Sequence, residues 1–109
     1  MTIATRRLTL TTPSGSRPLD IRIMAPQAEE TGWSCAFEID WPDGLARKAA
    51  YGVDSAQALI LALQMVGICL YTSQYHAAGQ LSFEKPGQGY GFPGTSTISD
   101  LLLGDDKLA

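Results

Sequence analysis

Two cysteines and a single histidine are the residues of this 109-residue chain that could pair a nucleophile with a base. A thiolate activated by an imidazole is a common catalytic arrangement, so Cys35 or Cys69 with His76 is the first candidate site. The residues around each cysteine predict that both thiols face the core, where cysteine packs as a small apolar residue. His76 falls near the end of a predicted helix, where an imidazolium caps free carbonyls. We therefore expect structural roles for all three residues.

The sequence offers no recognisable spacing of metal ligands and no cofactor motif. One histidine with scattered acids predicts no metal site, and the two cysteines form neither a CxxC motif nor a disulfide framework. The glycine-rich stretch 85–91 lacks the Gly-Lys-Ser/Thr of a phosphate-binding loop. We expect it to form a structural turn or a contact loop that displays Tyr90 and Phe92. The sequence thus predicts no catalytic residue, no cofactor and no metal.

Six charged residues on predicted strands could be taken for an acid–base cluster. Their opposite charges in neighbouring positions instead predict cross-strand ion pairs on a solvent-facing sheet surface, each worth about 0.2–1 kcal/mol. No two carboxylates stand apart as a general acid and a general base. The six residues are Asp20, Arg22, Glu38, Asp40, Arg47 and Lys48.

Composition predicts one folded domain and excludes several classes of partner. A hydrophobic fraction of 45% with 17% charged residues is typical of globular domains. The net charge of −3 and the absence of a basic cluster argue against nucleic acid or an anionic membrane as the partner. The first residues do not form a secretory signal, and the longest apolar run is too short to span a bilayer. We expect a soluble, cytoplasmic protein.

Alternating apolar residues predict an antiparallel sheet. The clearest pattern runs from Trp33 to Trp41, where every second residue is apolar, and we expect this strand to be central. Turn-forming residues separate it from its neighbours, which predicts hairpin-length connections. The other predicted strands cover residues 3–11, 19–24, 45–51 and, briefly, 81–83.

A long helix is the most distinct predicted element. Asp54 followed by Gln57 forms a capping-box pattern, and the body runs from Ser55 to about Ala78, with Gly79 as the residue that ends it. The predicted order is therefore β-β-β-β-α-β. We expect an α+β fold in which an antiparallel β-meander of four to five strands packs against one long α-helix. Residues 1–94 form a single domain, and residues 95–109 form a C-terminal tail with a short helix.

Three segments of the chain together resemble a known family. They are the helix start YGVDSAQALILAL at residues 51–63, the alternating strand that begins at Trp33, and the Gly91-Phe92-Pro93 motif. The chain resembles a family of short bacterial proteins catalogued as a domain of unknown function, with the likeness running from about Arg7 to Pro93. Because these motifs are structural, the resemblance implies a fold and a bacterial source but no catalytic residues.

The predicted helix is apolar over a wider arc than one sheet can cover. The sheet should take Leu59, Leu63, Val66 and Leu70, and this leaves other apolar residues in need of a cover. The tail, a second copy or an unrelated protein could supply it, and we favour a homodimer to which the tail contributes. The missing side chain at Gly67 favours this, because it allows a second helix to approach closely. The candidate interaction surface comprises Ile60, Leu61, Met65, Ile68, Tyr90, Phe92, Leu101 and Leu102.

Two functions of different classes follow from these patterns. The first is a non-catalytic protein-interaction module, of the immunity or adaptor type. The alternative is a small-ligand-binding protein or enzyme with a pocket between the helix and the sheet, or beneath the glycine-rich loop. We favour interaction, because each candidate catalytic residue also has a simpler structural role.

Overall fold

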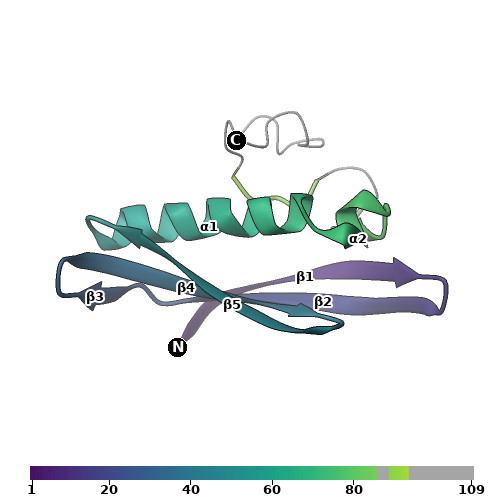
Figure 1. Ribbon diagram of the computed structural model, residues 1–109, viewed down its shortest axis with the longest axis horizontal. Helices are drawn as coiled ribbons and strands as arrows, with labels where there is room; N and C mark the ends of the chain where they lie inside the picture. Colours follow the sequence, from purple (N-terminus) through teal and green to yellow (C-terminus); the bar gives the residue numbers. More distant parts are fainter. Residues whose placement is uncertain (86–88, 94–109) are drawn as a thin grey trace.

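A computed structural model describes residues 1–85 and 89–93 of the chain. The described residues form a two-layer α+β domain in which two helices lie on one face of an antiparallel sheet (Figure 1). The elements in chain order are β1 (Thr2–Thr12), β2 (Gly15–Met24), β3 (Gln27–Glu29), β4 (Gly32–Trp41), β5 (Gly44–Gly52), α1 (Ser55–Tyr71), α2 (Gln74–Ala77) and β6 (Leu81–Ser82).

The predicted central strand is β4, which pairs with three other strands. One side of β4 pairs with β5 over its whole length, and the other side pairs with β3 and then β2. Beyond β2 lies β1, and β6 pairs with β1 at Thr9 and Leu10. The sheet therefore has six strands, not four or five. The additional strand is β3, which we expected to be part of a polar loop.

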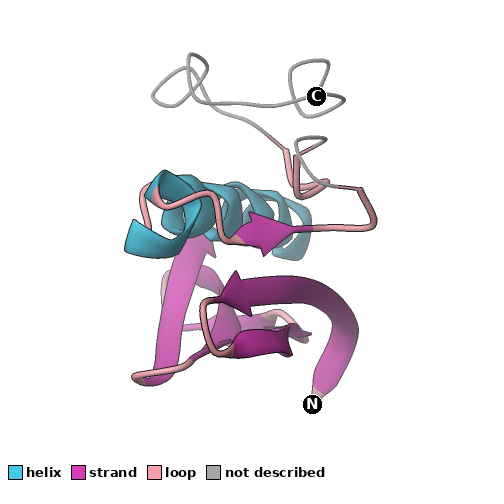
Figure 2. Ribbon diagram, turned by 90° about the vertical axis from the view of Figure 1, so that its right-hand side faces the viewer, coloured by secondary structure: helices cyan, strands magenta, loops and turns pink. Residues whose placement is uncertain are grey.

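The core lies between the sheet and α1, as the side view of the two layers shows (Figure 2). The alternation predicted for β4 is confirmed: Cys35, Phe37 and Ile39 are fully buried, while Trp33 and Trp41 are partly buried at the two ends. Strands β1 and β2 contribute their own alternate residues to the same face. These are Leu8, Leu10, Leu19, Ile21 and Ile23.

The predicted long helix is wrong in its length. Its start is confirmed, because the Asp54 side chain accepts a hydrogen bond from the Gln57 backbone N–H and the Gln57 side chain accepts one from Val53. The helix ends at Tyr71, where the hydroxyls of Thr72 and Ser73 donate to carbonyls of its last turn. Such side-chain bonds compete with continued helix. Ser73 then caps the short helix α2.

Residues 89–93 cover one flank of α1, and this corrects two expectations. Tyr90 and Phe92 are buried rather than displayed. Gly67, which we expected to favour contact with a second helix, instead faces this segment: a Cβ there would lie 3.4 Å from the Pro93 carbonyl oxygen and 3.6 Å from Phe92 Cβ. The chain itself therefore supplies part of the missing cover.

Two sequence expectations concern parts of the molecule beyond this core. The tail helix that would carry Leu101 and Leu102 lies outside the described residues. Within the described part of the chain, neither helix is long and apolar enough to cross a membrane.

Candidate functional site

The outer face of the sheet carries the predicted cross-strand ion pairs. Arg22 binds Asp40 at 2.7 Å and Glu38 at 3.0 Å, and Arg47 binds Glu38 at 2.8 Å. Asp20 pairs with Arg7 at 2.7 Å on the neighbouring strand. These contacts confirm the ion-pair interpretation for five of the six charged residues we predicted.

The sixth, Lys48, is an exception to that prediction. The β4–β5 register sets Lys48 opposite Phe37, which points into the core, while its neighbour Arg47 lies opposite Glu38. Successive strand residues face opposite sides of a sheet. Lys48 therefore lies on the face that carries α1, away from the ion-pair network.

The paired carboxylates are unsuited to proton donation. Hydrogen bonds from the Arg22 guanidinium lower the pKa of Asp40 and, together with Arg47, that of Glu38. The hydrogen bond from Arg7 likewise lowers the pKa of Asp20. A general acid at neutral pH needs a raised carboxyl pKa, so these groups act as partners of the arginines.

The two thiols are not activated. Cys35 is fully buried, and burial raises its pKa. Cys69 is partly buried; burial raises its pKa as well, and the nearby Lys48 ammonium opposes this effect without reversing it. Because the thiolate is the reactive form, both cysteines are weak nucleophiles. The packing role predicted for Cys35 is confirmed, whereas Cys69 also lines a cavity.

His76 contacts aromatic side chains and does not cap the long helix as we expected. It lies in α2, and its Nδ1 is within 2.5 Å of the Tyr90 hydroxyl. The ring also meets the edge of Tyr71, with the ring centroids 4.8 Å apart. Burial lowers the pKa of His76, so the folded protein favours the neutral imidazole, in which the tautomer sets whether Nδ1 or the Tyr90 hydroxyl donates the hydrogen bond. Neither cysteine is part of this cluster.

The pH dependence of stability tests this cluster. A histidine pKa lowered in the folded state means that the unfolded chain binds the proton first as pH falls through about 6.5. We expect the free energy of unfolding, measured by urea titration, to decrease from pH 7.5 to pH 5. The His76→Gln variant should lose this decrease. An equal pH slope in the variant would contradict the assignment, since the paired carboxylates lose their contribution only nearer pH 4.

A cleft runs between α1 and β5 on the side of the open sheet edge. One cavity of about 410 Å³ lies along its middle, and its walls are mostly apolar. No described strand pairs with the outer edge of β5, so this backbone edge lies open beside the cleft. The lining residues are Ala49, Ala50, Tyr51, Leu61, Gln64, Met65 and Ile68.

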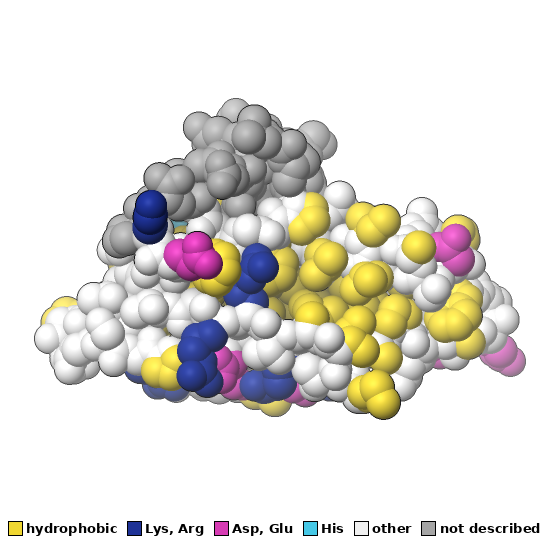
Figure 3. Space-filling view, turned by 180° about the vertical axis from the view of Figure 1, so that it is seen from behind, with side chains coloured by type: hydrophobic (Ala, Val, Ile, Leu, Met, Phe, Trp, Pro, Cys, Tyr) yellow, Lys and Arg dark blue, Asp and Glu magenta, His cyan; other side chains and the backbone are white. Residues whose placement is uncertain are grey.

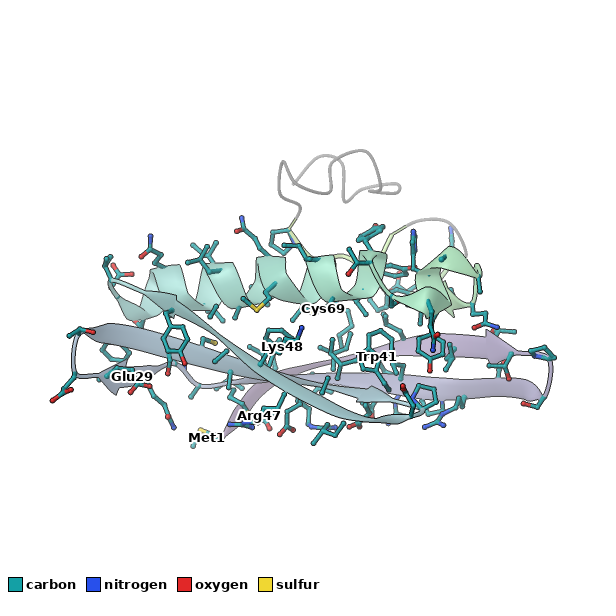
Figure 4. All side chains as sticks on the ribbon, viewed as in Figure 1. Met1, Glu29, Trp41, Arg47, Lys48 and Cys69 are labelled. Atoms are coloured by element: carbon teal, nitrogen blue, oxygen red, sulfur yellow. The ribbon has the colours of Figure 1, made fainter. Side chains whose placement is uncertain are left out.

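A second cavity, of about 270 Å³, follows along the same cleft toward α2. The two cavities are adjacent. Lys48 and Cys69 line the second cavity, and their sequence neighbours Ala49 and Ile68 line the first. Figure 4 shows Lys48 reaching from β5 toward Cys69 on α1, between the two layers. Trp41 forms part of the far wall, stacked on Tyr75 with ring centroids 5.2 Å apart.

The opposite flank of α1 is partly closed by the chain itself. Hydrophobic side chains gather on this side, in the view from behind (Figure 3). The Arg6 guanidinium lies over the rings of Phe83 and Phe92 and donates to the Tyr90 carbonyl at 3.0 Å. The cavity that remains, of about 180 Å³, is lined by Pro93 among others. Residues 89–93 thus bridge the edge of β1 and α1.

Six of the eight predicted interaction residues lie in the described part of the chain, and they separate into three groups. Leu61, Met65 and Ile68 line the α1–β5 cleft, whereas Ile60 is exposed but lies outside it. Tyr90 and Phe92 belong to the opposite flank and are buried. The position of Lys48 on the helix-facing side of the sheet was missed, although the alternation in β5 was visible in the sequence. Assigning its faces required the register with β4.

Among the described residues, no group of three or more His, Cys, Asp or Glu side chains lies close enough to hold a metal ion. In comparison with known families, residues 4–94 match a family described as a domain of unknown function (DUF6968). This range includes both helices and nearly the whole sheet. No curated protein and no solved structure matches the chain.

Proposed function

The chain belongs to the DUF6968 family of domains of unknown function, and from that premise we propose that it is a non-catalytic protein-interaction module which forms a homodimer through β5 and the α1–β5 cleft. The observation that carries the proposal is that the unpaired edge of β5 runs beside the apolar flank of α1. Paired carboxylates and thiols of raised pKa support a non-catalytic role.

Exposed apolar side chains are concentrated at this edge. Leu45, Tyr51 and Val53 are 57%, 69% and 80% exposed, and Leu61 on α1 is 36% exposed. By alternation the first three share one face of the strand and its extension. That face is the outer one, which also carries Arg47, whereas Leu61 lies on the α1 side of the same edge. Exposed apolar groups on both sides of an unpaired edge favour an interaction site, because leaving them in water is unfavourable.

A second copy fits this edge better than an unrelated strand. Antiparallel pairing of β5 with itself about a two-fold axis would extend the sheet and bring both α1 flanks together above it. Each copy would then supply Leu61, Met65 and Ile68 to one shared apolar contact. An unrelated strand would satisfy the backbone edge but would need a matching helix to cover these residues.

The register of such pairing follows from charge. Centring the two-fold axis on Lys48 would place two ammonium groups opposite each other, which is unfavourable. Centring it on Ala49 sets Lys48 opposite an alanine, Arg47 opposite Tyr51 of the second copy, and Leu45 opposite its Val53. This register pairs the exposed apolar residues with one another and stacks a guanidinium on an aromatic ring.

The other flank of α1 is a poorer candidate for the dimer contact. The edge of β1 pairs with β6, and residues 89–93 pack across its Arg6. Pro93, the last described residue, lies on that flank. The tail contribution that we expected stays a prediction, as does an immunity or adaptor role in a bacterial cell.

Two neighbouring helix positions provide a matched test. Leu61→Glu places a carboxylate in the proposed contact, whereas Ile60→Glu makes the same change at a 52% exposed position outside the cleft. Light scattering should show a dimer for the wild type and for Ile60→Glu. Because burying an unpaired charge costs several kcal/mol, Leu61→Glu should weaken dimerisation by about a hundredfold or more.

Melting curves would establish that both variants fold. A wild type that stays monomeric at about 100 µM, a concentration at which even a micromolar complex is formed, would contradict the proposal. Equal dimerisation of the two variants would contradict this interface.

A further inference from the structure

Lys48 is an unusual residue for the face on which it lies. The helix-facing positions next to it on β5 are Ala46 and Ala50, and the residue opposite it on β4 is Phe37. Lys48 is exposed to solvent, and its side chain interacts with the Cys69 thiol across the cleft. Its ammonium group is therefore accessible to an anion that enters the cavity. No described carboxylate forms an ion pair with Lys48, in contrast to Arg7, Arg22 and Arg47 on the outer face.

The cavity at Lys48 has the composition of a small-ligand site. Its volume of about 270 Å³ is just below the range of about 300–1,000 Å³ that is typical of pockets for drug-sized ligands. Phe37, Ile39 and the Trp41 ring provide apolar walls, and Lys48 provides one cation. Asp43 also lines the cavity and lies 3.3 Å from the Tyr75 hydroxyl, so a negative charge already occupies that part of the wall.

We propose that this cavity binds a small monocarboxylate with a flat apolar body, whose carboxylate pairs with Lys48 while its body packs against the Trp41 ring. A single ammonium matches a single negative charge, and the Asp43 carboxylate disfavours a more highly charged ligand such as phosphate. The volume limits the body to about one aromatic ring, because drug-sized ligands need larger pockets.

Phenylacetate is a suitable probe, and the two tryptophans provide an internal control. Trp41 lines the cavity and Trp33 does not, although both lie on the same strand. Titration followed by the NMR signals of the indole N–H groups should give a saturable shift for Trp41 and none for Trp33. Phenylacetamide, which lacks the charge, should bind about tenfold or more weakly, and inorganic phosphate, which lacks the body, should cause no saturable shift.

Charge removal on the two faces of β5 distinguishes this site from a general effect of net charge. Lys48→Met should weaken phenylacetate binding by about tenfold or more, the size expected for loss of a charge-assisted hydrogen bond, and Lys48→Gln should do the same. Arg47→Met removes the same charge from the outer face and should leave the affinity unchanged.

Several results would overturn this inference. They are a Trp41 shift that does not saturate, an equal response of Trp33, and unchanged affinity in both Lys48 variants. Repeating the titration with Leu61→Glu separates the site from the proposed dimer, because that variant alters the neighbouring cavity and leaves Lys48 in place. Binding by this variant would support the ligand site whichever oligomeric state the wild type adopts.

Discussion

The Phe37→Ala variant should lose about 3–5 kcal/mol of the free energy of unfolding, which is the usual cost of truncating a buried phenylalanine. Phe37 is fully buried at the centre of β4, the strand to which β2, β3 and β5 are all bonded. The shortened side chain would leave a void beneath α1 that a sheet paired on both sides cannot readily close. For a domain of this size, the loss is a large share of total stability.

Urea unfolding at one pH would measure this loss, with Ile3→Ala as the control. Ile3 is also a large apolar strand residue, but about half of it is exposed. Its truncation should cost less than about 1 kcal/mol. If Phe37→Ala lost no more free energy of unfolding than Ile3→Ala, the placement of Phe37 in the core would be wrong.

Gly52→Ala should be the most damaging of the small substitutions. A Cβ at Gly52 would lie 2.5 Å from the Ala58 backbone nitrogen and 2.9 Å from the Gln57 carbonyl carbon, in the first turn of α1. These are backbone atoms of a capped helix, so they cannot move away as a flexible side chain can. We expect a loss of about 1–3 kcal/mol or more, as is typical of overpacking.

The same substitution at Gly67 is the matched control. Its Cβ would make ordinary contacts of 3.4 and 3.6 Å, and alanine is favoured over glycine inside a helix by about 1 kcal/mol. Gly67→Ala should therefore leave stability unchanged or raise it slightly. A Gly52→Ala variant as stable as the wild type would show that β5 and α1 are not in close contact.

The elements that were predicted well are those whose signals are local. The Trp33–Trp41 alternation repeats over a whole strand, and the Asp54 cap depends on a residue three positions away. The end of α1 was missed because threonine and serine also occur inside helices, so Thr72 and Ser73 do not by themselves predict a helix end. They end it through hydrogen bonds to particular carbonyls. The strand β3 was missed because its three residues are stabilised by pairing with β4.

The candidate site could be predicted only in part, because its geometry is non-local. The wide apolar arc of α1 indicated a need for further cover, part of which residues 89–93 supply, and Leu61, Met65 and Ile68 line the cleft on the other flank. The sequence could not show that residues 89–93 close one flank, since this depends on Arg6 meeting Phe92 from a distant strand. For the same reason, Tyr90 and Phe92 were assigned to the surface.

Hydrogen exchange in β5 tests the proposed homodimer most directly. In the isolated chain, the β5 amides that point away from β4 have no strand partner among the described residues and should exchange quickly. Self-pairing predicts that these amides become protected as protein concentration rises, and that Leu61→Glu abolishes the protection. Fast exchange that is independent of concentration, in a wild-type protein whose β4 amides remain protected, would contradict the account.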